Sequence, residues 1–179
     1  MPNHVINEVT LHGVSLARAK PLIESDGCEI DFEVAVPLPV NFWPGNVGAR
    51  HKEAFPGTHL DAASKTWGTK WNAYGLNEGG KYESVREVDG STILTFQSAW
   101  SHPRGWTVAL FSLLKCDITA KWLSEGGWAG HIEEYRFKGL EDMSIDAWTD
   151  TEIEDGSEEH RHLHKLLWGV EEFDDEDES

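Results

Sequence analysis

Four side chains could form a surface that binds a planar, negatively charged ligand or a partner. They are three indoles and one ammonium group: Trp67, Lys70, Trp71 and Trp100. Indole rings beside a cation suit stacking on a nucleobase, as in proteins that bind single strands. Tryptophan also fills protein cores, and an extended segment would place Trp67 and Trp71 on one face with Lys70 on the other. A packing role and a binding role therefore both stay open.

Three histidines lie close together in the segment from His160 to His164. Positions 160 and 164 are one helical turn apart, the spacing that helical zinc sites use. No Glu or Cys completes the set at a recognisable spacing, so we expect no metal site and no cofactor. The imidazoles lie beside carboxylates, and docking of this segment could therefore depend on pH.

Carboxylates that could hold Mg²⁺ or act as acid and base gather near the C-terminal end: Asp146, Asp150, Glu152, Glu154 and Asp155. Such chemistry needs convergent geometry, which a charge-rich segment does not reveal. Nucleophile motifs, a phosphate-binding loop and a dinucleotide-binding glycine pattern are absent from the sequence. Since no nucleophile, base and orienting group can be named together, we expect a non-enzymatic protein.

Negative charge is concentrated at one end of the chain. The 179 residues include 15 Lys and Arg and 32 Asp and Glu, a net charge of −17. Residues 1–139 carry a net −3 and residues 140–179 a net −14. This balance disfavours direct nucleic-acid binding. The last nine residues have too few apolar groups to fold alone, and they serve either as a solvating tail or as an interaction surface that includes Asp174, Asp175, Glu176 and Asp177.

The first third of the chain predicts a strand, a helix and an extended segment. Alternating apolar residues predict the strand over residues 4–12, with polar Asn7 on its inner face. A helix follows within residues 15–25, where Pro21 requires a late start or a kink. Residues 29–36 are expected to be extended.

The middle of the chain contains the clearest local signal. Residues 40–65 are expected to be a long loop or insertion, and the chain becomes strand-like from Trp67. A hairpin is predicted within residues 82–100, because Asp89 and Gly90 accept the positive φ of a two-residue turn between two alternating runs.

The next elements complete an α+β pattern. Pro103 opens a predicted helix, with Ser101 or His102 as its cap, and strands follow over residues 118–122 and 128–137. The order of strand, helix, strands, helix, strands is typical of an antiparallel sheet with helices on one face.

The acidic end contains one more predicted helix, near residues 157–170. Ser157 is a suitable N-cap, and leucines recur at helical spacing along one side. A helix this short depends on docking its apolar face. It could dock on the main domain, on a second copy in a homodimer, or on a partner.

Three sequence blocks resemble a known family: WGTKWNA at 67–73, TFQSAWSHP at 95–103 and EGGWAG at 125–130. With the opening MPN they resemble the YubB-like ferredoxin-like domain family of bacteriophages and plasmids, over residues 1–139. The resemblance implies a βαββαβ core with two helices on one sheet face, and places residues 140–179 outside it as an acidic extension. Asn72 and His102 depart from the family pattern. The family has no established activity.

Together these observations favour a phage or plasmid accessory protein that binds a host macromolecule, most simply a host protein. It would inhibit a defence or nucleic-acid-processing system through its acidic, DNA-mimic-like surface. The alternative is a small-molecule or nucleotide-binding domain that uses the Trp and Lys signature. Two cysteines without a short spacing, no long apolar run and no signal peptide favour the cytoplasm and argue against a membrane protein.

Overall fold

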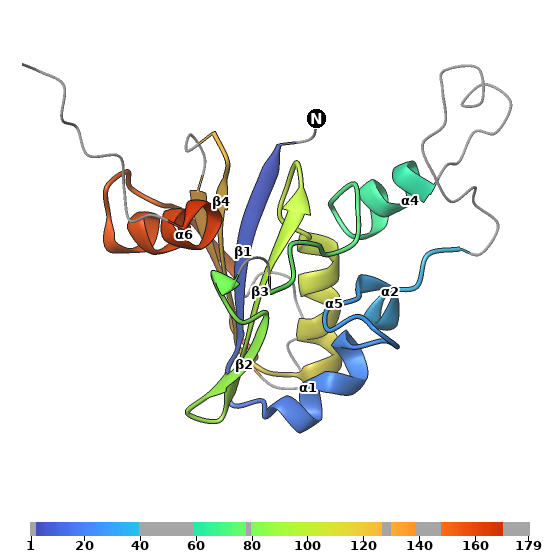
Figure 1. Ribbon diagram of the computed structural model, residues 1–179. Coiled ribbons are helices and arrows are strands. Elements are labelled where there is room, and N and C mark those ends of the chain that lie inside the picture. The colour runs from blue at the N-terminus through green and yellow to red at the C-terminus, as the bar shows by residue number, and fades with distance from the viewer. Residues whose placement is uncertain (1–2, 40–58, 78–79, 127–129, 139–147, 170–179) are drawn as a thin grey trace, which may run out of the picture.

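The chain folds as a mixed α+β structure around one antiparallel sheet (Figure 1). The computed structural model describes residues 3–39, 59–77, 80–126, 130–138 and 148–169. The strands are β1 (His4–Leu11), β2 (Val85–Val88), β3 (Ser91–Ala99), β4 (Ile118–Ser124), β5 (Gly130–Tyr135) and β6 (Trp148–Glu152). They lie in the order β2-β3-β1-β4-β5-β6, with every neighbouring pair antiparallel. The predicted α+β class with an antiparallel sheet is confirmed.

Helices cover both faces of the sheet (Figure 1). On one face lie α1 (Leu16–Ile23), α2 (Phe32–Ala35) and α5 (Arg104–Leu114), while α6 (Glu158–Trp168) lies on the opposite face. The remaining helix of the described residues, α4 (His59–Thr66), contacts α5. The sheet is therefore the middle layer of the molecule, with its two faces buried by different parts of the chain.

The larger core lies between the sheet and helices α1, α2 and α5. Phe96 of β3 packs edge-on against Phe32 and Trp106, with ring centroids 5.5 and 5.7 Å apart. Val9 and Leu11 of β1 point into the same core because alternate residues of a strand share a face. Aromatic pairs of this kind contribute about 0.5–1.5 kcal/mol each beyond the burial of their area.

A smaller apolar cluster lies between the sheet and α6. Its buried members are Ile6, Tyr82, Leu123, Ile153, Leu163 and Leu167. Both β6 and α6 follow residue 139, so the sheet and its second face continue into the acidic end of the chain. The helix expected near residues 157–170 thus docks on the same sheet as the preceding part.

The hairpin between β2 and β3 follows directly from its turn residues. Asp89 and Gly90 have φ of 49° and 73°, the left-handed backbone that a two-residue hairpin turn requires. Val88 and Ser91 pair on either side of the turn. The predicted hairpin is confirmed.

Several local expectations are corrected. Residues 29–36 contain the short helix α2, which Asp31 caps by accepting a hydrogen bond from the Glu33 amide, instead of an extended segment. Residues 67–71 form no strand, and the loop meets β3 through the Thr69–Ala99 hydrogen bonds and the isolated bridge between Tyr74 and Gln97. The Asp31 cap is a local signal for α2, whereas the path of residues 67–71 is decided by contacts with the distant strand β3.

The helix after Pro103 also begins differently from the expectation. Its N-cap is Pro103 itself, without a side-chain cap, and neither Ser101 nor His102 caps it. The His102 ring is instead buried, with its Nδ1 within hydrogen-bond distance of Asn7 Oδ1. In the first helix, α1 begins at Leu16 and retains Pro21 within it.

Parts of the prediction fall outside the described residues. They include most of the loop expected over 40–65, of which residues 59–65 lie in α4, and the start of the strand expected at 128. The four acidic residues chosen in the tail also lie there: Asp174, Asp175, Glu176 and Asp177.

Candidate binding surface

Trp67 belongs to the core and has no exposed surface. Its indole packs edge-on against Phe32, with centroids 5.6 Å apart, and its Nε1–H donates to the carbonyl oxygen of Val36 at 2.8 Å. Because the apolar ring is buried and its one N–H donor is satisfied, no part of this indole is left to bind another molecule. Trp67 therefore cannot contact a ligand in this structure.

The chain leaves the core immediately after Trp67. Gly68 has φ of 90°, and a Cβ built on it would lie 3.2 Å from the Arg104 amide nitrogen. Both the positive φ and this close contact favour glycine at the position. Thr69 then fastens the loop to the end of β3. Its Oγ1 donates to the Ala99 carbonyl at 2.8 Å and accepts from the Ala99 amide at 3.1 Å.

This fastening brings Lys70, Trp71 and Trp100 together, and we call these three residues the indole–ammonium patch. Lys70 Nζ lies 5.3 Å from the centroid of the Trp71 ring and 5.1 Å from that of Trp100. Both distances lie within the range of cation–π attraction. Three of the four Trp and Lys residues selected from the sequence thus lie together, while the fourth, Trp67, is buried in the core.

Trp100 is held in an unusual backbone conformation. Its φ is 76°, which is an outlier for a bulky side chain, and 64% of its surface is exposed. Its amide donates to the Asn3 carbonyl at 2.9 Å, so the conformation is supported by the strand ends around it. Such backbone strain costs of order 1–3 kcal/mol and clusters at functional sites.

The aromatic surface continues from Trp71 toward the start of β1. The Trp71 ring lies 6.0 Å from that of Tyr74, which lies 5.6 Å from the His4 ring. The Tyr74 hydroxyl donates to the Ser98 carbonyl at 2.9 Å, which fixes its ring. The patch therefore borders a row of partly exposed rings that the sequence did not identify.

A buried polar network supports the loop that carries Trp100. Asn7 Nδ2 donates to Ser98 Oγ at 2.8 Å, and Asn7 Oδ1 lies 2.9 Å from His102 Nδ1. Nε2 of the same imidazole lies 3.0 Å from Thr107 Oγ1, and Ser98 Oγ donates to the Ser101 carbonyl at 2.8 Å. A polar residue on the inner face of the first strand was the available sequence signal for this network.

Burial makes His102 a neutral residue. Removal of the ring from water lowers its pKa to about 4, although the nearby Glu133 charge acts in the opposite direction. The imidazole therefore acts at neutral pH as one donor and one acceptor, which its two partners satisfy. Its role is structural support of the 98–103 segment.

A second polar cluster joins α5 to β5 and β6. Arg104 Nε donates to both oxygens of the buried Glu133 carboxylate at 3.0 and 3.2 Å, and the Tyr135 hydroxyl donates to it at 2.5 Å. The guanidinium also lies 4.7 Å from the centroid of the Trp148 ring and 3.5 Å from Asp150. The cluster ties the edge strand β6 to the helix.

The charge state of Glu133 follows from these contacts. Burial alone would raise the pKa of its carboxyl, but the hydrogen bonds from Arg104 and Tyr135 and the positive guanidinium outweigh it and lower the pKa. Burial and the Glu133 charge raise the pKa of Tyr135. A carboxylate that is kept ionised by the hydrogen bonds it accepts is a poor proton carrier. The contacts of Glu133 therefore indicate a structural role for this cluster.

The histidines of α6 point in different directions. The rings of His160 and His164 are 6.1 Å apart in largely buried positions, while His162 Nε2 lies 3.1 Å from Glu8 Oε2. Among the residues that the structure describes, no three His, Cys, Asp or Glu side chains converge as metal ligands. Of the carboxylates selected near the C-terminal end, Asp150 pairs with Arg104 and His131, while Asp146 lies outside the described part.

Comparison with known proteins supplies no relative. No family model, characterised protein or solved structure matches the chain. None of the helices in the described ranges combines the length and apolar character needed to cross a bilayer. The functional conclusion therefore rests on the side chains themselves.

Proposed function

We propose that the chain is a non-enzymatic binding protein that contacts a partner protein through the indole–ammonium patch. The observation that carries this proposal is Trp100, a large indole held outward by a left-handed backbone. A buried indole would stabilise the fold, whereas an exposed one in strained backbone contributes little to it. The arrangement is therefore better explained by contact with another molecule.

The chemistry of the patch favours a protein partner. Tryptophan residues carry a large share of the binding energy in protein interfaces, and cations beside them add cation–π attraction. The net charge of −17 opposes a polyanionic ligand by long-range repulsion. A nucleotide stacked on Trp100 with its phosphate at Lys70 is the competing occupant.

The finer fold assignment is part of the same proposal. We infer that β1, α1, β2, β3, α5 and β4 form a ferredoxin-like βαββαβ core of the YubB-like family. Support comes from their order along the chain and from the strand order β2-β3-β1-β4. On this proposal β5 adds a further strand, β6 and α6 belong to the acidic extension, and the protein acts in the cytoplasm of a phage or plasmid host.

Native mass spectrometry of the full chain, purified from the cells that produce it, tests the partner. We expect a retained protein in the wild type that is lost from Trp71→Ala and from Lys70→Gln. The matched control is Trp168→Ala, which removes another exposed indole, 48% accessible, far from the patch at the end of α6. A retained nucleotide, or a partner lost equally from all three variants, would contradict the proposal.

The acidic end supports a second candidate function. The exposed carboxylates on or beside β6 and α6 include Glu152, Glu154, Asp155 and Glu158. Packing of Leu163 and Leu167 holds these elements on the sheet, so this negative surface has a defined shape. We propose as the alternative that it engages a basic groove that normally holds a phosphate backbone.

Salt dependence separates the two candidates. Binding through the acidic surface should weaken steeply as salt rises. Added ions shorten the Debye length, which is about 8–10 Å at 0.1–0.15 M salt, and so screen the attraction between the two charged surfaces. Binding through the patch should change little, and it should survive Glu152→Gln combined with Glu158→Gln. Loss of binding in that double variant with retention in Lys70→Gln would support the acidic surface instead.

A further inference from the structure

Lys70 is the charged member of the indole–ammonium patch, and its charge is not balanced within the described part of the chain. Its Nζ lies 5.3 Å from the centroid of the Trp71 ring and 5.1 Å from that of Trp100. Among the described residues, no Asp or Glu carboxylate lies within ion-pair distance of this nitrogen. The indole faces attract the cation, but they bring no negative charge of their own. In the free protein, water therefore has to solvate this ammonium group.

A partner that covers Trp100 would also remove water from Lys70. Trp100 is 64% exposed, more than any other large apolar side chain in the described part of the chain, so its ring is the natural anchor for a partner. Because Lys70 Nζ lies close to the centre of that ring, a surface that covers the indole also covers the ammonium group. Removal of a charge from water is costly unless an opposite charge pairs with it. The partner must therefore bring the negative charge.

The charged groups farther along the row of rings lie at the opposite end from Lys70. Glu125 lies beyond Tyr74 and His4, with its Oε2 3.9 Å from His4 Nε2. The Tyr74 hydroxyl donates to the Ser98 carbonyl and so accepts from His4 Nδ1 at 2.9 Å. The row thus has a cation at one end and a carboxylate at the other. A negative group of a partner is attracted to the Lys70 end.

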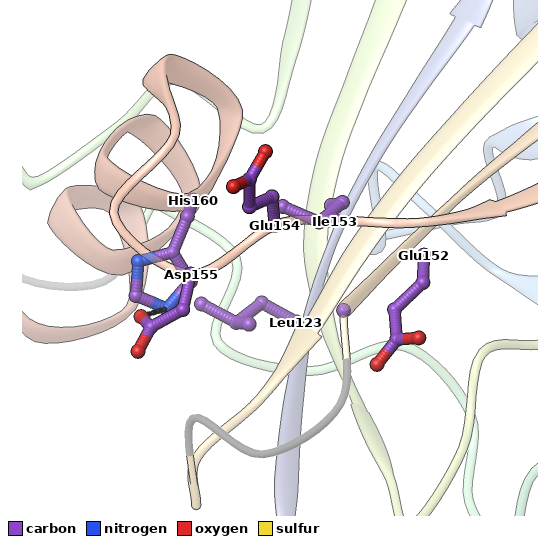
Figure 2. Close-up of a pocket in the computed structure, with 7 residues that line it drawn as sticks. Leu123, Glu152, Ile153, Glu154, Asp155 and His160 are labelled. Carbon is purple, nitrogen blue, oxygen red and sulfur yellow. Dashed lines mark ion pairs between the residues drawn. The ribbon is translucent and has the colours of Figure 1, made fainter.

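The cavity beside α6 has the opposite charge and does not compete for such a group. It measures about 450 Å³ and lies where β5 and the end of β6 meet the start of α6 (Figure 2). Three carboxylates contribute to its lining, those of Glu152, Glu154 and Asp155. Its imidazole, His160, has Nε2 3.5 Å from Asp155 Oδ1. A negative group is repelled from this cavity.

We propose that the patch binds an internal segment of the partner protein in which one acidic side chain, Asp or Glu, lies between apolar side chains. This inference rests on the proposed function and names the chemistry of its partner. The carboxylate pairs with Lys70 Nζ, and the apolar side chains cover the exposed ring of Trp100. A neutral or basic segment leaves the ammonium group buried without a counter-charge, so the patch discriminates against it. A single carboxylate also suits a chain of net charge −17, which repels a polyanion.

Titration of the ¹⁵N-labelled full chain with defined peptides tests this assignment. The NMR signals to follow are the indole N–H groups of Trp71 and Trp100. N-acetyl-Leu-Glu-Leu amide should give saturable shifts of both signals. The same peptide with Gln in place of Glu should bind at least about fivefold more weakly, because it lacks the charge. The peptide with Lys at that position should give no saturable shift.

Lysine variants separate this ion pair from general electrostatics. Lys70→Gln should bring the affinities of the Glu and Gln peptides to within about twofold of each other, because the charge that distinguishes them is gone. Lys70→Arg keeps a cation beside the indoles and should retain most of the preference. The matched control is Lys20→Gln, which removes the same charge from α1, where Lys20 pairs with Glu24 at 3.2 Å. The control should leave the preference unchanged.

The outcomes that would overturn the inference concern the carboxylate. They are equal binding of the Glu and Gln peptides to the wild type, a preference that survives Lys70→Gln, or no saturable shift with the Glu peptide. Tighter binding of adenosine monophosphate than of the Glu peptide would overturn it as well. The proposed function is judged separately, by whether native mass spectrometry finds a retained protein, so the failure of one is distinguishable from the failure of the other.

Discussion

Trp67 and Trp100 lie on either side of the contact between the 67–71 loop and the end of β3, but Trp67 is buried and Trp100 is exposed. Trp67 is fully buried in ordinary backbone, with its indole N–H satisfied by Val36. Trp100 is mostly exposed, with φ of 76° and Lys70 over its ring. Removal of the Trp67 side chain should therefore lower the stability of the fold, and removal of the Trp100 side chain should weaken partner binding.

The difference shows how one short segment serves both stability and function. Gly68 and Thr69 separate the buried indole from the patch, and their contacts with Arg104 and Ala99 set the direction of the chain. A rigid core side chain next to a surface residue holds the surface in place before a ligand arrives. Preorganisation of this kind reduces the entropy lost on binding.

The largest effect is expected from Trp67→Ala. Removal of a fully buried indole leaves a cavity and an unsatisfied Val36 carbonyl, which should lower the free energy of unfolding by about 3–5 kcal/mol. Urea denaturation followed by circular dichroism measures it. A loss below about 1 kcal/mol would contradict the assignment of Trp67 to the core.

The next effect concerns the network beneath the patch and appears as a pH dependence. The unfolded state protonates His102 near pH 6.5, whereas the folded state keeps it neutral down to about pH 4. As pH falls through this range the unfolded state gains a proton that the folded state does not bind. The contribution of His102 to stability should therefore fall by roughly 3 kcal/mol across this range and change little further below pH 4.

Comparison of the wild type with His102→Gln isolates this term. Urea denaturation at pH 7 and pH 4.5 should show a clearly smaller loss of stability for the variant. Equal losses in the two proteins would mean that His102 is not held neutral by burial.

A smaller effect is expected at the opposite face of the sheet. Burial alone would raise the pKa of Glu8, but hydrogen bonds from His162 and Arg86 outweigh it and lower the pKa. His162→Ala removes one of these partners and should lower stability by roughly 1 kcal/mol at neutral pH. Arg161→Ala, at an exposed neighbouring position on α6, is the control and should change stability by less than about half of that. Equal effects would show that the Glu8 contact does not hold the helix.

Local patterns were sufficient for much of the fold. Alternation, turn residues and helical spacing predicted β1, the Asp89-Gly90 hairpin and the positions of α5 and α6, because these signals lie within each segment. The strand β6 was missed because its sequence, Trp148 to Glu152, is mostly polar and lacks apolar alternation. Pairing with β5 and the contact of Trp148 with Arg104 explain it.

The candidate surface could be predicted only in part. Residue types selected Trp67, Lys70, Trp71 and Trp100, but an isolated sequence cannot distinguish a buried indole from an exposed one. Burial depends on tertiary contacts such as those of Phe32 and Val36 with Trp67.

The most direct test of the central claim is Trp100→Gly. Glycine accepts the positive φ without strain, and this gain should offset the lost cation–π contact and the added freedom of the unfolded chain. Urea denaturation should therefore find stability within about 1 kcal/mol of the wild type, while native mass spectrometry finds the partner protein absent. A variant that is equally stable and still retains the partner would contradict the account.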